Sequence, residues 1–114
     1  MGGSTLNVWV ADEPEERQQG LRGVSRLPDE VDGMLFVFPE PAIPTFVMLG
    51  ALIPLDLWFF DGEGALAGSA EMEPCPEEPC PRYPAPGPVT RALETPLGEH
   101  DFQPGDGLST SASG

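Results

Sequence analysis

Frequent prolines and glycines limit the apolar segments of this chain to short runs, and this spacing is the strongest constraint on its fold. Fifteen prolines and fourteen glycines are spread over 114 residues. Both residues are unfavourable inside helices, whereas strands of about four to eight residues fit between such breaks. Because the breaks separate apolar runs rather than forming one tract, we expect a folded, β-rich chain and not a disordered one.

The apolar runs predict seven strands, and a capping pattern predicts one helix. A short helix is expected from about residue 13 to 19, because Asp12, Pro14 and Glu15 form an N-terminal capping pattern and Gly20 or Gly23 can end it. Pro39, Pro41 and Pro44 predict an extended loop. Strands are expected at residues 6–10, 33–38, 45–49, 55–60, 65–72, 89–95 and, as the last element, 105–109.

These elements predict one mainly β domain over residues 1–114. We expect a compact barrel or sandwich-like fold with one short N-terminal helix. Its ordered core should cover residues 5–109, with frayed ends at 1–4 and 110–114.

The charge of the chain disfavours some classes of binding partner. Nineteen Asp and Glu face five Arg and no Lys, which gives a net charge of −14. Such a surface repels phosphate backbones and anionic lipids, so we expect no nucleic-acid or membrane partner, and a monomer. The absence of lysine excludes Schiff-base catalysis by a lysine amine. No export signal is visible, which leaves the compartment open.

The longest apolar run, residues 45–60, contains one ionisable side chain, that of Asp56. Strand alternation places Asp56, Trp58 and Phe60 on one face, where two rings would solvate the carboxylate poorly and raise its pKa toward that of a general base. The alternative is a structural acid that accepts backbone N–H groups at the Pro54 bend, and this is the commoner case.

Four further residues are weaker candidates. Glu71 is expected opposite the aromatic strand, either as a second pocket acid or as an exposed strand-end acid like Glu73. His100, the only histidine, is expected to be solvated in its loop. Arg82 and its neighbour Tyr83 could orient an anionic ligand, although a surface role is commoner.

Four residues separate Cys75 from Cys80 in an acidic, proline-rich loop. This is not the two-residue spacing of a redox-active pair, and two cysteines with one histidine do not complete a zinc site. A structural disulfide is the first expectation, free thiols the second, and a metal site a distant third. We expect no metal and no cofactor.

Several segments together resemble one family, the bacterial and archaeal domain of unknown function 192. The matching pieces are VADEPEERQQGLRGV, GMLFVFPEP, LIPLDLWFFDGEG, AEMEPCPEEPCPRYPAPGPV and ALETPLG followed by QPGD. The resemblance implies a compact, β-rich single domain with a small helix near its N-terminus, and the family has no established activity that can be carried over to this chain. One departure is conspicuous: after Phe46, members continue Trp-Met-Lys-Asn-Thr, whereas this chain has Val47, Met48, Leu49, Gly50 and Ala51. These changes would leave a cleft emptier and more apolar, as in a divergent member or an engineered scaffold.

The sequence therefore favours a non-enzymatic domain whose apolar pocket holds a small hydrophobic molecule. The pocket residues we expect are Phe46, Val47, Met48, Leu49, Gly50, Trp58 and Phe60. One alternative is an enzyme without cofactors, in which Asp56 or Glu71 removes a proton from carbon, as in a Kemp-type elimination. Another is a protein-interaction module that uses the loop at residues 73–88.

Overall fold

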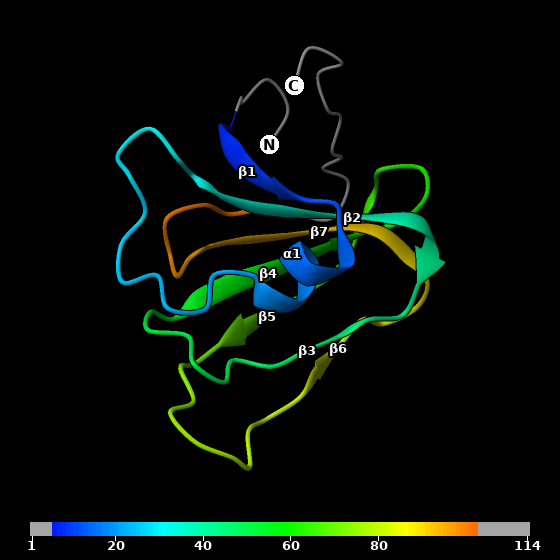
Figure 1. The fold of residues 1–114 in the computed structure, drawn as a ribbon. Helices are drawn as coiled ribbons and strands as arrows, with labels where there is room; N and C mark the ends of the chain where they lie inside the picture. Colours follow the sequence, from blue (N-terminus) through cyan, green and yellow to red (C-terminus); the bar gives the residue numbers. More distant parts are fainter. Residues whose placement is uncertain (1–5, 103–114) are drawn as a thin grey trace.

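Eight short elements make up residues 6–102, the part of the chain that the computed structural model describes (Figure 1). They are β1 (Val8–Ala11), α1 (Pro14–Gln19), β2 (Gly33–Ala42), β3 (Thr45–Phe46), β4 (Leu55–Phe60), β5 (Leu66–Met72), β6 (Tyr83–Pro84) and β7 (Val89–Pro96). The strand expected at residues 105–109 and both expected frayed ends lie outside the described residues.

Five strands form one sheet in the order β1-β2-β7-β4-β5, and β3 and β6 pair as a separate two-stranded ribbon. β1 and β2 are parallel and connected through α1, while the other neighbours are antiparallel. The mainly β fold with one short helix is confirmed. The expectation of a barrel is wrong, because β1 and β5 form the two open edges of the sheet in the described residues.

The strand bounds follow the apolar pattern where tertiary pairing agrees with it. β4 has the predicted bounds and β7 is one residue longer than predicted. β2 differs, because it continues through Pro39 and Pro41 to Ala42. Its register against β7 shifts between Val37 and Ala42, where the prolines have no N–H to donate to the ladder. β3 ends at Phe46, three residues earlier than predicted, and the short strand β6 was not predicted.

α1 begins at Pro14, one residue later than predicted, with Glu13 in the preceding cap position. The Glu16 carboxylate accepts hydrogen bonds from the backbone N–H groups of Asp12 and Glu13, both at 3.1 Å, and these bonds lower the pKa of Glu16. The helix ends at Gly20, whose positive φ of 54° favours glycine. The Arg17 guanidinium donates to the Val37 carbonyl oxygen at 3.0 Å, which holds the helix beside β2.

Side chains of the sheet pack on both faces. The helix face carries Phe36, Leu57, Phe59 and Ala92, and it is covered by Leu21 and Leu27 after α1 and by Phe46, Met48 and Ala51. The loop face carries Leu35, Trp58, Phe60 and Leu93, with Phe102 packed against them. Each large side chain buried in this way contributes about 1.5–3 kcal/mol.

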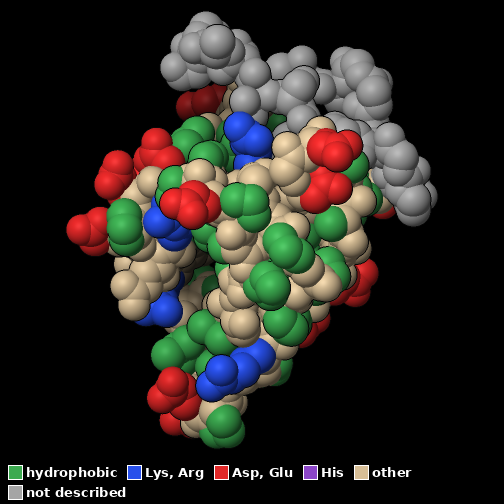
Figure 2. Space-filling model, turned by 90° about the vertical axis from the view of Figure 1, so that its right-hand side faces the viewer, with side chains coloured by type: hydrophobic (Ala, Val, Ile, Leu, Met, Phe, Trp, Pro, Cys, Tyr) green, Lys and Arg blue, Asp and Glu red, His purple; other side chains and the backbone are tan. Residues whose placement is uncertain are grey.

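The surface of the molecule mixes charged and apolar side chains. Figure 2 shows acidic side chains around the edge of one side of the molecule and hydrophobic ones gathered at its centre. No helix within residues 6–102 is long and apolar enough to cross a membrane.

Candidate functional site

The predicted aromatic face exists, and it is the loop face. Trp58 and Phe60 pack edge-on against Phe102, with ring centroids 4.8 and 6.0 Å apart. The Trp58 Nε1–H group donates to Thr95 Oγ1 at 3.1 Å. Asp56, which is 8% exposed, accepts a hydrogen bond at its Oδ2 atom from the Gly98 backbone N–H at 2.9 Å. This carboxylate therefore binds the loop that follows β7.

Glu71 lies directly opposite Asp56 in the register of β4 and β5, and it is exposed. The structure brings these two predicted acids together on adjacent strands. It does not bring them to the predicted wall at residues 46–50, since Phe46 and Met48 belong to the core of the helix face. A functional role for Asp56 or Glu71 stays a prediction.

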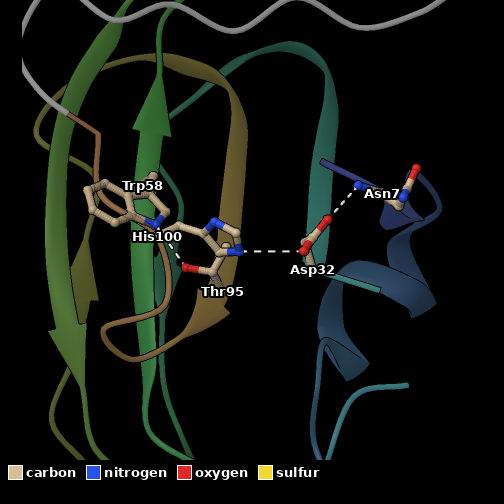
Figure 3. A network of polar contacts seen from close by, with 5 residues as sticks. All are labelled: Asn7, Asp32, Trp58, Thr95 and His100. Atoms are coloured by element: carbon tan, nitrogen blue, oxygen red, sulfur yellow. Dashed lines mark hydrogen bonds and ion pairs between the residues drawn. The ribbon is translucent and has the colours of Figure 1, made fainter. Parts of the chain in front are cut away.

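Polar contacts close the end of the loop face (Figure 3). Asp32 accepts a hydrogen bond from the Asn7 backbone N–H at 2.8 Å, and its Oδ1 atom lies 3.6 Å from His100 Nε2. The His100 side chain is 19% exposed, so this histidine lies against the protein instead of in solvent as expected. The contact joins the loop after β7 to the segment before β2.

A pocket of about 230 Å³ opens on the helix face, and we call it the Glu94 pocket. The turn that ends α1 forms one wall, and the segment before β4 forms the other. The lining consists of residues 17–22 and 45–49 together with Phe36, Ala51, Leu55 and Glu94. Arg17 and Arg22 are the basic residues that line this pocket.

Glu94 is the buried acid of this pocket. β7 lies between β2 and β4, where Glu94 pairs with Met34 on one side and Leu57 on the other. Its residue is 5% exposed, and its carboxyl group makes no hydrogen bond or ion pair with any residue between 6 and 102. Burial without a partner raises the pKa of Glu94 to about 8. The carboxyl group is thus mostly protonated at neutral pH.

Gly20 leaves the space in which this carboxyl group lies. A Cβ atom at Gly20 would be 3.4 Å from the Phe36 ring and 3.9 Å from Glu94 Oε1. A larger residue at this position would therefore narrow the pocket directly above the acid, and the positive φ of Gly20 disfavours one as well.

The wall at residues 47–51 is apolar, as the sequence indicated. Met48 and Ala51 are buried, while Val47 is exposed at the mouth. Gly50 has a φ of +80°, and a Cβ atom there would lie 2.8 Å from the Arg22 Cγ atom. The Arg22 side chain therefore packs against the Gly50 backbone.

The disulfide expected between Cys75 and Cys80 is present, with an S–S distance of 2.10 Å. It supports the pocket wall. The Cys75 N–H donates to the Met48 carbonyl oxygen at 3.2 Å, and the Gly50 N–H donates to the Cys75 carbonyl oxygen at 3.1 Å. These bonds join the cysteine loop to the pocket segment.

A second hollow of about 450 Å³ lies at the end of the sheet, among residues 25–32, 53–54 and 96–99. Its lining includes the acids Asp29, Asp32 and Glu99 and one base, Arg26, which forms an ion pair with Asp29 at 3.1 Å. Within residues 6–102, no three His, Cys, Asp or Glu side chains are grouped closely enough to hold a metal ion.

Sequence reasoning missed Glu94, although its strand was predicted. The segment ALETP offers one weak signal, an acid two residues after Ala92 in a strand of buried residues. Its burial follows from two facts that the sequence does not state, namely the central position of β7 and the cover provided by the turn after α1.

The fold and the pocket define a small, mainly β protein with a buried acid in a cleft that apolar and polar side chains line together. The model of domain of unknown function 192, described as "Uncharacterized ACR", matches residues 1–110, and the chain belongs to this family. No functionally curated protein matches the chain.

Two solved structures share the fold. A protein of unknown function from Novosphingobium aromaticivorans is 32% identical, with a TM-score of 0.69 over 78% of this chain, and the match spans 61% of its own length. A protein from Sinorhizobium meliloti, provisionally designated a transcription regulator, is 28% identical, with a TM-score of 0.70. That match covers 80% of this chain and 68% of the other.

Proposed function

We propose that this protein binds a small, largely apolar molecule in the Glu94 pocket, with the Glu94 carboxyl group as the polar anchor. The observation that carries the proposal is a buried carboxyl group that lines a pocket and has no partner among the described residues. The carboxyl oxygens of Glu94 are open to the pocket, so a ligand that enters it can replace water as their hydrogen-bond partner.

The lining sets the chemistry of the ligand. Phe36, Phe46, Met48 and Leu55 offer apolar contacts, which suit an aromatic or branched aliphatic body. A volume of about 230 Å³ is below that of pockets for drug-sized molecules, which is about 300–1,000 Å³, so one or two rings fit best. Because protonated Glu94 donates one hydrogen bond, the ligand should carry an acceptor such as a carbonyl oxygen.

The proposal keeps part of the predicted pocket. Phe46, Val47, Met48 and Leu49 line it, whereas Trp58 and Phe60 pack on the loop face. The polar residue assigned to the pocket is Glu94 instead of Asp56, the acid predicted from the sequence.

A titration with benzamide tests the proposal. We expect saturable changes in the backbone amide NMR signals of residues 46–51. The variant Glu94→Met keeps the size of the side chain but removes the donor, so benzamide affinity should fall about tenfold, the equivalent of one hydrogen bond. Toluene has no hydrogen-bond acceptor, so Glu94→Met should bind it as tightly as the unaltered protein does. The matched control Glu63→Met alters an exposed turn acid.

Two results would contradict this function. One is the absence of saturable changes at residues 46–51 with either ligand. The other is an equal benzamide affinity in Glu94→Met and the unaltered protein.

The predicted interaction surface at residues 73–88 is a second candidate. Residues 76–79 are exposed in the cysteine loop and include Glu77 and Glu78, which suits a basic partner segment. Replacing both acids by glutamine should abolish capture of an arginine-rich peptide without lowering the thermal midpoint.

A further inference from the structure

We propose that Glu94 is a general base that removes a proton from carbon in a flat, heteroaromatic carbon acid bound in the Glu94 pocket. This inference rests on the proposed function and adds a reaction to it. It assigns catalysis to the helix face of the sheet, away from Asp56 and Glu71.

The surroundings of Glu94 suit a base that acts on carbon. A C–H group forms no strong hydrogen bond, so the carboxylate that attacks it must be free of water and of competing donors. Glu94 has no competing donor, because no described residue donates to its carboxyl group. Phe36, Met48 and Leu55 form the apolar part of the lining, and a flat substrate that fills the pocket displaces water from the carboxylate. Gly20 leaves the approach to Oε1 open.

The charged residues that line the pocket around Glu94 all lie on its α1 side. Its strand neighbours Met34 and Leu57 are uncharged, and so are the residues at 45–49, Ala51 and Leu55. From the helix side come Arg17 and Arg22. Arg17 is engaged, since its guanidinium donates to the Asp12 and Val37 carbonyl oxygens and lies 5.5 Å from the centre of the Phe38 ring.

Arg22 is exposed and its guanidinium has no partner within residues 6–102. It lies against Gly50 at the edge of the pocket and therefore offers a positive charge to an anion that forms there. A base at the floor and a cation at the rim fit a substrate whose proton leaves at one end while negative charge develops at the other.

The ring opening of 5-nitro-1,2-benzisoxazole has this form. The Glu94 carboxylate takes the proton from C3, and the C–H electron pair becomes the second π bond of a nitrile. The N–O bond breaks and its electron pair remains on oxygen, which leaves as a phenolate. Glu94 then loses its proton to water. Every atom and electron is supplied by the substrate and the carboxylate, so the step needs no cofactor.

The experiment follows phenolate release by the full chain at several pH values. We expect kcat/KM to rise with pH through a single limb near 8, because burial raises the pKa of Glu94 to about 8. Glu94→Gln should lower kcat/KM at least about 100-fold, the usual contribution of a general base. The matched control Glu63→Gln should leave the rate unchanged, and circular dichroism should show both variants folded.

Two further variants locate the base. Asp56→Asn and Glu71→Gln remove the acids of the loop face, and both should retain the rate and the limb near 8. If either abolished the reaction while Glu94→Gln kept it, the base would lie on the loop face and the proposal would be overturned.

Binding and turnover separate this inference from the proposed function. If benzamide binds as described and the benzisoxazole is not turned over, general-base catalysis fails while the binding function stands. If neither molecule perturbs the signals of residues 46–51, both fail. A rate that does not depend on pH between 6 and 9 would likewise overturn the role of Glu94.

Discussion

A single carboxyl group sets the character of the helix face. Glu94 lies on a central strand without a hydrogen-bond partner among the described residues, where an ionised side chain is strongly unfavourable. The protein accommodates it by keeping it protonated, which ties the stability of the fold to pH. The buried acid therefore lowers the stability of the fold in the alkaline range, where its carboxyl group ionises.

The variant Glu94→Gln tests this link between pH and stability. The folded pKa of about 8 lies above the ordinary value of 4.5, so the folded state holds a proton that the unfolded state releases. Stability should therefore fall as pH rises from 4.5 to 8, by up to about 1.4 kcal/mol per pH unit. The free energy of unfolding, measured with urea at pH 5, 7 and 9, should fall less steeply with pH for Glu94→Gln than for Glu63→Gln. An equal fall of the free energy of unfolding with pH in the two variants would show that Glu94 is not protonated in the folded state.

The backbone at Gly50 is a second position where one residue matters. Gly50→Ala should destabilise the protein by about 1–2 kcal/mol, because the left-handed conformation at φ +80° is unfavourable for alanine and the Arg22 side chain must also move. Chemical denaturation measures the change. Gly87→Ala is the control, since no atom lies within 4 Å of its added Cβ, and it should cost nothing. Equal stabilities of the two variants would contradict this account.

Among the elements, the segment between β3 and β4 depends on a partner distant in sequence. Two backbone hydrogen bonds and a bridge between Leu49 and Cys75 join it to the disulfide loop. The wall of the Glu94 pocket is therefore held by residues about 25 positions away along the chain. The loop contributes order to the pocket although the loop itself does not line it.

Removing the disulfide should consequently affect the pocket as well as stability. In Cys75→Ser/Cys80→Ser we expect a loss of about 2 kcal/mol, the chain-entropy value for so short a loop. We also expect faster amide hydrogen exchange at Gly50 than at Leu57 in the central sheet, because the Gly50 N–H donates to Cys75. Unchanged exchange at Gly50 would show that the loop does not hold the wall.

The elements also show which features the sequence could predict. β4 was predicted with its bounds because its apolar pattern and its pairing agree. β2 extends beyond its predicted end at residue 38, through Pro39 and Pro41, because a strand tolerates proline where its N–H group is not needed for a hydrogen bond to the next strand. β6 is two residues long and forms only by pairing with β3, so no local signal marks it. The apolar wall at residues 47–51 was predicted, but its acid was not, because Glu94 is separated from the wall by more than 40 residues.

On the scale of the whole molecule, the open sheet separates two sets of side chains that the sequence predicted in one pocket. Phe46 and Met48 lie on the helix face, whereas alternation along β4 places Trp58 and Phe60 on the loop face. A closed barrel would have gathered one of these sets inside and left the other in solvent. Here both faces are covered, one by the turn after α1 and the other by the loop that carries His100 and Phe102. The acids on the two faces therefore belong to separate environments, as their different partners show.

The net charge of −14 also acts on the molecule as a whole. Charges interact over about 30 Å at 0.01 M salt but only about 8 Å at 0.15 M. The extents of 37, 32 and 26 Å mean that, at low salt, acids on opposite sides repel one another through the fold. Moving from 0.01 to 0.15 M NaCl at pH 7 should therefore raise the thermal midpoint, by roughly 5 °C if the relief is on the order of 1 kcal/mol.

The origin of this salt effect can be checked by changing pH. Near pH 4.1, the sequence pI, the net charge vanishes and the same change in salt should leave the midpoint almost unchanged. Glu94→Gln should respond to salt at pH 7 as the unaltered protein does, because the Glu94 carboxyl group is neutral there and adds nothing to the repulsion. A midpoint that fell with salt at pH 7, or rose equally at both pH values, would show that self-repulsion does not limit the stability of this fold.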